Sequence, residues 1–302
     1  MKINRREFLE KSALGVGSVL LGAPRIRGAE QKAEVFDPYE KVTLGKIKLP
    51  ASRVAMGTGM RGGQRQSNHT RMGKEKFEAL LRGAYERGVR MFDLADLYGS
   101  HPYLIPALKG LLRDTYSIIT KIWWRPGGLP EKERPDADVV VERFLKELQT
   151  DYIDVVLLHC VESGKWPEEL RKQMDLLAKF KDKGLIRAHG VSCHSLPALE
   201  AAANEPWVDS VNARINPYGT KMDGPPEKVA PVLKKMRAAG KGVVGMKLIG
   251  EGEFRNSDEK RDHSISYVLG LGCVDVLDVG FEKLEEIDDF AARVRKVQKT
   301  PA

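Results

Sequence analysis

Four ionisable side chains of four different types stand at or just beyond the ends of apolar runs in this chain. Asp93 closes the run VRMFD, Tyr98 follows five residues later, Lys121 follows YSIIT, and His159 ends IDVVLLH. A phenol has a pKa of about 10, whereas a nearby ammonium group favours the phenolate and lowers that pKa. A carboxylate can hold the ammonium group, and an imidazole can orient a substrate oxygen. If the fold brings these groups together, they could perform general acid–base chemistry.

The elements that must position these residues alternate regularly along the chain. Amphipathic helices, such as 74–88, 137–148 and 168–184, are predicted between eight β-rich runs at 53–57, 89–93, 116–120, 153–159, 186–192, 208–213, 242–247 and 275–280. This alternation predicts an α/β fold with a single domain, a closed (β/α)8 TIM barrel. An open doubly wound sheet is the alternative, but GTGMRGG (57–63) lacks the G-x-G-x-x-G spacing typical of that fold.

Shorter segments flank the predicted barrel, which spans residues 41–296. The run VTLGKIKLP (42–50) predicts a β-hairpin that caps the barrel floor, and residues 297–302 form a tail. Functional residues of such barrels gather at the C-terminal ends of the strands, where the four ionisable residues are expected. The fold therefore predicts that they converge at one barrel mouth.

The same strand ends resemble the aldo-keto reductase family. FDLADLYG (92–99) resembles the family motif D-x-A-x-x-Y-G, and SIITK (117–121) and YIDVVLLHC (152–160) resemble the strands that carry the family's lysine and histidine. GVS (190–192) resembles the segment under the nicotinamide. NARINP (212–217) is similar to Q-x-x-Y-N-P, with Asn212 in place of Gln and Ile215 in place of Tyr. The similarity covers about residues 41–296.

The resemblance implies an NAD(P)H-dependent oxidoreductase that transfers a hydride to or from an aldehyde, ketone or sugar carbonyl. Tyr98 is then the general acid/base, Lys121 lowers its pKa, Asp93 anchors Lys121, and His159 orients the substrate oxygen. The hydride must come from a cofactor because no side chain can supply it. NADP(H) is the family default, and NAD(H) is the alternative.

Three residues are expected at the nicotinamide. Ser192 and Asn212 match the family positions that contact this ring, and Cys193 stands where the family usually has Asn. Because a thiol is a weak hydrogen-bond donor, one contact to the carboxamide is expected to be lost or moved.

The phosphates and adenosine are assigned to two later segments. Lys247, Gly250 and Gly252 are expected at the pyrophosphate, since glycines let backbone amides approach an anion. Lys283 would meet a 2′-phosphate, whereas Glu282 would bond a free ribose hydroxyl and so favour NAD(H).

Two tryptophans and two arginines near the strand ends are candidates for the substrate pocket. Trp123 and Trp124 are expected to wall an apolar pocket, with packing under the loop as the alternative. Arg125 and Arg214 are interpreted as solvated charges rather than as a site for an anionic substrate. No metal site is predicted.

The N-terminus is predicted to be an export signal. Residues 1–29 combine a charged start with a modest apolar stretch from Ala13 to Ala23, which is too short to span a bilayer. Arg5 and Arg6 resemble a twin-arginine signal. We therefore expect recognition by twin-arginine export machinery, a linker at 30–40, no stable membrane anchor, and a periplasmic or secreted protein exported in its folded form.

Composition restricts the remaining function classes. The net charge is +8, residues 1–29 contribute half of it, and no basic run follows, so a nucleic-acid partner is not expected. The three cysteines fit neither a zinc pattern nor a redox pair. Two alternatives remain: a non-catalytic sensor that keeps the barrel and cofactor site, and a barrel hydrolase or isomerase without a redox step. A metal-dependent hydrolase would need about two or three His or acid ligands at the mouth. His159 and His194 could contribute to such a site, but their spacing is not diagnostic.

Overall fold

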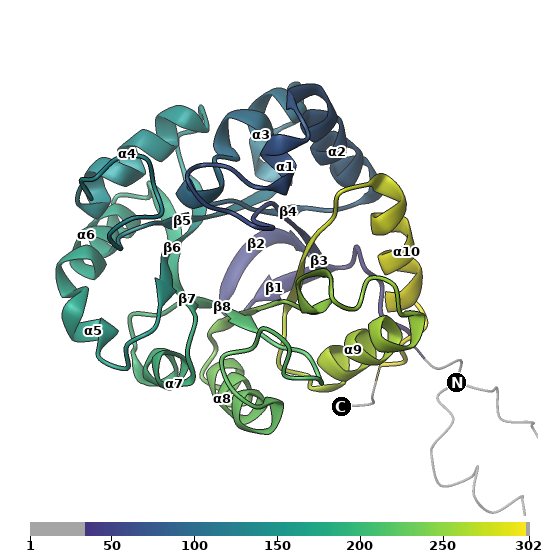
Figure 1. The fold of residues 1–302 in the computed structure, drawn as a ribbon. Helices are drawn as coiled ribbons and strands as arrows, with labels where there is room; N and C mark the ends of the chain where they lie inside the picture. Colours follow the sequence, from purple (N-terminus) through teal and green to yellow (C-terminus); the bar gives the residue numbers. More distant parts are fainter. Residues whose placement is uncertain (1–33, 300–302) are drawn as a thin grey trace, which may run out of the picture. The chain divides into compact units, whose positions relative to one another are not determined.

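The computed structural model describes residues 34–299, whose strands close into an eight-stranded parallel barrel surrounded by helices (Figure 1). The predicted signal at 1–29, the first four residues of the predicted linker and the last three residues of the tail lie outside the described residues. Going round the barrel, the strands are β3 (Val54–Gly57), β4 (Met91–Asp93), β5 (Ser117–Ile122), β6 (Ile153–Val161), β7 (Ile186–Cys193), β8 (Ser210–Arg214), β9 (Gly242–Met246) and β10 (Val276–Gly280). The predicted TIM barrel is confirmed, and every predicted run overlaps one of these strands.

A β-hairpin fills the floor of the barrel, as predicted. Strands β1 (Lys41–Leu44) and β2 (Ile47–Ser52) pair in antiparallel fashion, and Gly45 between them has a positive φ of 59°. The hairpin side chains Leu44 and Leu49 join an inner cluster with barrel residues such as Met91 and Leu157. The floor is therefore closed by apolar packing, and the opposite end is left for chemistry.

Helices cover the outside of the barrel and bury a second, larger apolar cluster between themselves and the strands. They are α1 (Asn68–Arg71), α2 (Lys74–Arg87), α3 (His101–Ala107), α4 (Ala137–Glu147), α5 (Trp166–Glu169), α6 (Arg171–Asp182), α7 (Leu196–Asn204), α8 (Pro226–Ala238), α9 (Asp258–Gly270) and α10 (Leu284–Val294), with 3-10 turns η1 (Asp96–Tyr98), η2 (Arg113–Thr115) and η3 (Gly250–Gly252). The helix predicted at 168–184 is split in two at Leu170, whose backbone departs from helical angles. Among residues 34–299, no helix is long and apolar enough to cross a membrane.

The two ends of the described chain meet at the floor side. Val35 and Gln298 form an antiparallel bridge, and the Phe36 amide donates to the Val297 carbonyl over 3.0 Å. The amide of Val54, the first residue of β3, donates to the Pro38 carbonyl over 2.9 Å. Since a parallel strand begins at the floor, these contacts lie at the end of the barrel opposite the mouth.

Candidate functional site

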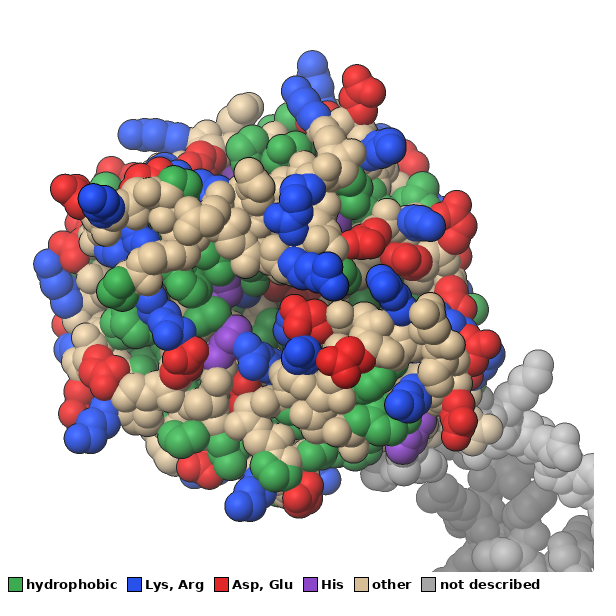
Figure 2. All heavy atoms as spheres, viewed as in Figure 1, with side chains coloured by type: hydrophobic (Ala, Val, Ile, Leu, Met, Phe, Trp, Pro, Cys, Tyr) green, Lys and Arg blue, Asp and Glu red, His purple; other side chains and the backbone are tan. Residues whose placement is uncertain are grey.

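The four predicted catalytic residues meet at the C-terminal ends of three neighbouring strands. Asp93 ends β4, Tyr98 ends the turn η1 that follows, Lys121 lies near the end of β5, and His159 lies near the end of β6. The hydroxyl of Tyr98 lies 3.2 Å from His159 Nε2, and the two rings meet edge to face. The mouth is a hollow in which histidine and basic side chains lie side by side (Figure 2).

Lys121 lies behind the phenol and is completely buried. Its ammonium group forms an ion pair with Asp93 and donates to the Leu94 carbonyl over 3.1 Å. Nζ lies 4.9 Å from the centre of the Tyr98 ring, and within residues 34–299 no hydrogen bond joins it to the phenol hydroxyl. Asn212 completes the arrangement by donating from Nδ2 to the second Asp93 oxygen over 3.3 Å.

The pKa of the Tyr98 phenol is set mainly by its burial. Burial raises the pKa of its phenol well above 10, and the charge of Asp93 raises it further, whereas Arg214 lowers it. Lys121 is not among the groups that shift this pKa most, so its predicted lowering of the phenol pKa stays a prediction. The phenol therefore keeps its proton at neutral pH.

His159 carries no charge at neutral pH. Burial lowers the pKa of its imidazole well below 6.5, and the charges of Lys121, His194 and Arg214 lower it further. A neutral imidazole can accept or donate one hydrogen bond at Nε2 without adding charge to the mouth. Of the pair, Tyr98 is consequently the group that holds a transferable proton.

Two glycines of the loop after β3 make room for Tyr98. A methyl group added to Gly59 or to Gly62 would overlap the Tyr98 ring. Two glycines of the string GTGMRGG therefore make room for the Tyr98 ring. Sequence reasoning missed this role, since the loop and the tyrosine are far apart in the chain.

An ion network holds η1 from the side away from the mouth. The buried carboxylate of Asp96 pairs with Arg65 at 2.9 Å and with Arg143 at 2.6 Å. Arg143 also pairs with Glu147 at 2.8 Å, and Glu147 contacts His101 Nδ1 at 2.7 Å. The turn that carries Tyr98 is thus tied to helices α3 and α4.

A bulge near the end of β6 brings Cys160 to the mouth beside His159. The pairing register with β7 shifts between Leu158 and Val161, and Cys160 has a positive φ of 56°. Its sulfur lies 3.3 Å from His194 Nε2. Three atoms that could bind a metal, one each from His159, Cys160 and His194, lie within 4.8 Å of one another.

Charge argues against a cation among these three side chains. Arg214 faces His194 Nδ1, and because guanidinium N–H groups only donate, that nitrogen must accept and the His194 proton must sit on Nε2. Burial raises the pKa of Cys160 to about 11, although the charges of Arg214, Lys121 and Arg125 lower it. A positive ion there would meet a protonated nitrogen, a neutral thiol and nearby cations.

The two predicted substrate-pocket tryptophans have different positions. Trp123 is partly exposed, and its ring centre lies 5.5 Å from that of His159, so it lines the mouth. Trp124 points the other way, packs against the outer apolar cluster, and donates from its indole to the His159 carbonyl over 2.8 Å. Only Trp123 is placed to meet a substrate.

A cleft with about 610 Å³ of empty space opens beside Tyr98, between the glycine loop and the ends of β9 and β10. Asp93, Tyr98, Lys247, Gly252 and Asp278 are among its lining residues. The side-chain amide oxygen of Asn212, buried near Asp93, has no hydrogen-bond partner in the described chain. An orphaned acceptor of this kind suits the carboxamide of a nicotinamide, so the residues present fit the predicted cofactor.

Of the other residues predicted near the nicotinamide and pyrophosphate, some reach the barrel interior or the cleft and others do not. Ser192 faces the barrel interior, where its hydroxyl lies 3.3 Å from His194 Nε2. The side chain of Cys193 is fully buried in the outer apolar cluster, so it does not reach the mouth. Gly250 lies over the Phe254 ring, whereas Gly252 opens to the cleft.

The two residues predicted at the adenosine, Glu282 and Lys283, lie at different places on the surface. Glu282 accepts from the Asn68 side chain over 2.6 Å and lines a second hollow that continues from the cleft past Gly252. Lys283 is exposed and lines a separate surface groove against α1 and α2. The second hollow instead contains the exposed Arg255, which sequence reasoning missed.

Asp278 is a further site residue that sequence reasoning missed. Its carboxyl group is buried at the cleft, where Oδ1 has no partner in the described chain and would lie 2.8 Å from a methyl group on Gly57. Burial raises the pKa of Asp278 well above its usual value, and the charge of Asp93 raises it further. The available signal was an acid near the end of the apolar strand DVLDVG.

Comparison with known proteins shows which family the chain resembles. The family model described as "Aldo/keto reductase family" matches residues 53–279. Aldo-keto reductase YhdN of Bacillus subtilis is 27% identical over 241 residues, which are 74% of this chain and 69% of that protein. Methylglyoxal reductase DkgB of Salmonella typhimurium is 28% identical over 145 residues, and the match spans 52% of its length, or about half.

Solved structures share the fold at low sequence identity. Aldo-keto reductase AKR11C1 from Bacillus halodurans has a TM-score of 0.69 and 20% identity, over 87% of this chain and 93% of that one. An aldo/keto reductase from Klebsiella pneumoniae in complex with NADP and acetate has a TM-score of 0.63 and 20% identity, over 86% of this chain and 92% of that one.

Proposed function

The chain belongs to the aldo/keto reductase family, and on that premise we propose that it is an NADP(H)-dependent oxidoreductase acting on an aldehyde or ketone. The observation that carries the proposal is the 3.2 Å approach of the Tyr98 hydroxyl to His159 Nε2 beside an open cleft. The buried Lys121–Asp93 pair behind the phenol supports it further.

The proposed reaction divides proton and hydride between two sources. NADP(H), when bound, supplies the hydride to the substrate carbon. Tyr98 donates its proton to the substrate oxygen, and His159, neutral, orients that oxygen through Nε2. The phenolate that remains is stabilised by the ammonium group of Lys121, 4.9 Å from the ring centre. Because the phenol pKa is raised, the acid form persists across neutral and mildly alkaline pH.

We propose NADP(H) over NAD(H) on two grounds. Arg255 lines the hollow beyond Gly252 and could pair with a 2′-phosphate. The Klebsiella pneumoniae structures, of the same fold, are complexes with NADP and NADPH. We expect Arg255→Ala to raise KM for NADPH at least tenfold and to leave KM for NADH within threefold. An equal change for both dinucleotides would count against the assignment.

The decisive experiment for the proposed acid is Tyr98→Phe. We expect kcat for aldehyde reduction to fall about 10²–10⁴-fold, since general acid catalysis contributes that much. Binding of NADPH, followed by its fluorescence, should stay within threefold, because the ring that packs on the glycine loop is kept.

The matched control is Tyr103→Phe. It removes the hydroxyl of a different tyrosine, which lies in α3 and packs on Phe77. Its kcat should stay within threefold of the wild-type value. Undiminished turnover in Tyr98→Phe would overturn the proposed mechanism, and turnover lost equally in both variants would show only a folding defect.

Export through the twin-arginine route is a separate proposal, supported by Arg5, Arg6 and the short apolar stretch after them. In a bacterium that has this machinery, we expect cell fractionation to find the wild-type chain in the periplasm. The double variant Arg5→Lys, Arg6→Lys should remain in the cytoplasm. Equal distribution of the two proteins would contradict the proposal.

A further inference from the structure

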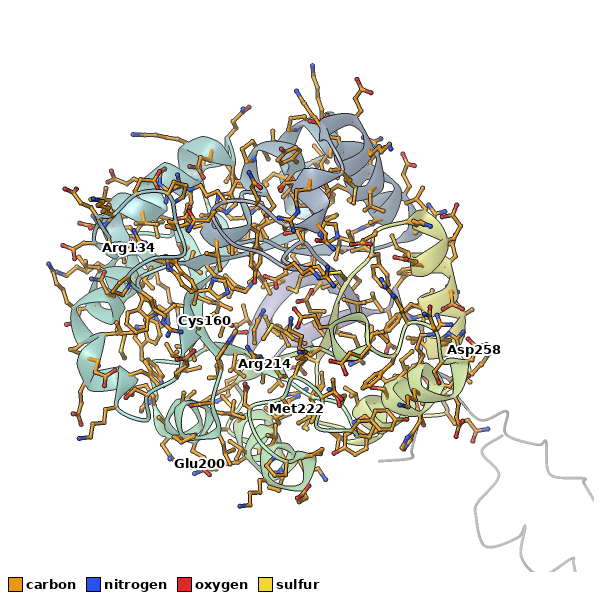
Figure 3. The ribbon with its side chains drawn as sticks, in the orientation of Figure 1. Arg134, Cys160, Glu200, Arg214, Met222 and Asp258 are labelled. Carbon is orange, nitrogen blue, oxygen red and sulfur yellow. The ribbon has the colours of Figure 1, made fainter. Side chains whose placement is uncertain are left out.

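Arg214, predicted to be a solvated charge, lies in the mouth of the barrel. It is the last residue of β8, two residues after Asn212, and alternate residues of a strand face the same side. Asn212 reaches Asp93 inside the barrel, so Arg214 also points inward, and 21% of its side chain is exposed. Figure 3 shows Arg214 at the barrel opening, with Cys160 across from it.

The guanidinium group of Arg214 has more donors than partners. One terminal nitrogen donates to His194 Nδ1. The other lies 3.5 Å from the Asp223 carboxylate, and Nε is buried without an acceptor in the described chain. A guanidinium group offers five N–H donors, and an unmet buried donor costs free energy. The group is therefore prepared for a further acceptor.

His194 fixes the guanidinium group and contributes no positive charge of its own. Burial and then Arg214 lower the pKa of His194 to about 3, so the imidazole is neutral. Its Nε2 lies 3.3 Å from both Ser192 Oγ and Cys160 Sγ. Held between strand ends and Arg214, the ring orients the guanidinium group as a fixed binding surface.

This cation lies within reach of the reacting groups. The rings of His159 and His194 are 6.2 Å apart, and His159 contacts the Tyr98 hydroxyl. The charge of Arg214 lowers the pKa of both Tyr98 and His159. A substrate carbonyl at Tyr98 would therefore place its neighbouring carbons beside Trp123 and a more distant group at Arg214.

We propose that Arg214, oriented by His194, binds a carboxylate, so that the substrate of the proposed reductase is an aldehyde or ketone that carries a carboxylate group. The inference rests on the proposed function and adds the substrate class. A guanidinium group matches a carboxylate with two parallel hydrogen bonds, which gives both affinity and orientation.

Asp223 is the internal competitor for Arg214. Both of its oxygens are buried, and burial raises its pKa to about 6, although the charge of Arg214 and a hydrogen bond from the Arg214 backbone lower it. Arg214 and Cys193 are the titratable groups that face it. Above pH 6 the ionised Asp223 opposes a substrate carboxylate, and its removal should tighten binding.

The test uses pairs of aldehydes that differ in charge. At pH 8, we expect kcat/KM for 4-carboxybenzaldehyde to exceed that for 4-methylbenzaldehyde at least tenfold. Arg214→Met should lower the value for the carboxylated aldehyde at least 30-fold and leave the neutral one within threefold. Asp223→Asn should change KM in the opposite direction, lowering it for the carboxylated aldehyde alone.

Arg125→Gln is the matched control, because Arg125 is a second mouth arginine already paired with Glu162 at 2.6 Å. It should leave the ratio of the two aldehydes unchanged. A preference for the neutral aldehyde, or an equal loss of both in Arg214→Met, would overturn the subsite.

The subsite and the proposed function can fail separately. Calorimetry with benzoate and benzyl alcohol tests the subsite without turnover, on the folded, cofactor-loaded protein. Benzoate binding that Arg214→Met weakens at least tenfold supports the subsite even if no aldehyde is reduced, a result that would refute only the reductase proposal. Benzoate binding that is absent, or unaffected by Arg214→Met, refutes the subsite.

Discussion

At the scale of single residues, the candidate site depends on side chains that are absent as much as on those present. Tyr98 is the proposed proton donor, and its ring can lie where it does only because Gly59 and Gly62 have no side chain. A phenol moved by about 1 Å from its productive position would lose much of its catalytic effect.

Gly59→Ala should therefore reduce activity without removing any functional group. We expect kcat to fall about 10–100-fold, because the added methyl group displaces the Tyr98 ring. The control is Gly63→Ala in the same loop, where an added methyl group meets nothing within 4 Å. Steady-state kinetics that show equal kcat for the two variants would contradict this reading of the loop.

Sequence reasoning predicted which side chains lie at the site but not all of their pKa shifts and orientations. The order of Asp93, Tyr98, Lys121 and His159 along three strand ends was enough to predict that they meet. The raised pKa of the phenol could not be predicted, because it depends on burial that only the packed fold creates. The inward position of Arg214 was likewise hidden, since the sequence does not say which face of a short strand is buried.

At the scale of elements, the short turn η1 needs support because one 3-10 turn has little stability of its own. That support comes from Asp96, which Arg65 and Arg143 hold from behind, and from the further ion pair of Arg143 with Glu147. The position of Tyr98 thus depends on charges of α4 that lie outside the mouth.

The ion network that includes Glu147 should make the free energy of unfolding fall as the pH becomes acidic. Burial alone would raise the Glu147 pKa, but His101 and Arg143 outweigh it and lower that pKa to about 2 from 4.5. A depressed carboxyl pKa contributes stability that is fully present above the unfolded value and is lost as pH falls through the folded value. The contribution of Glu147 should therefore be lost between about pH 4.5 and pH 2.

Glu147→Gln tests this dependence. We expect it to lower the free energy of unfolding by about 1–2 kcal/mol at pH 7, measured in urea, and the difference from wild type to shrink as pH falls below about 4. Glu142→Gln, at an exposed position on the same helix, should change stability by less than about 0.5 kcal/mol. A difference that stays constant down to pH 2.5 would contradict the assignment.

At the scale of the whole molecule, the barrel separates stability at its floor from chemistry at its mouth. The hairpin β1–β2 was predictable because its strands are short, alternating and joined at a glycine. Its packing partners were not, since the inner cluster draws side chains from several strands far apart in sequence. The break at Leu170 was also missed, because an uninterrupted apolar period continues through it.

Leu44→Ala should separate the two ends of the barrel. Leu44 is fully buried in the floor, so its truncation should cost about 2–5 kcal/mol of unfolding free energy. We expect kcat/KM to stay within twofold at a temperature where the variant is folded. Lys41→Ala, at an exposed position on β1, should leave the urea midpoint nearly unchanged. Loss of activity in folded Leu44→Ala would show that the floor and the mouth are coupled.

The meeting of the chain ends through Val35 and Gln298 makes the described polypeptide almost a closed ring. Whatever is fused before residue 34 or after residue 299 begins beside the floor, outside the path by which cofactor and substrate enter. Purification tags, surface tethers or a peptide joining one end to the other could therefore be attached there without shielding the entrance. If the two ends were joined and the chain were opened in an outer loop, the product would be a circularly permuted protein with the same barrel.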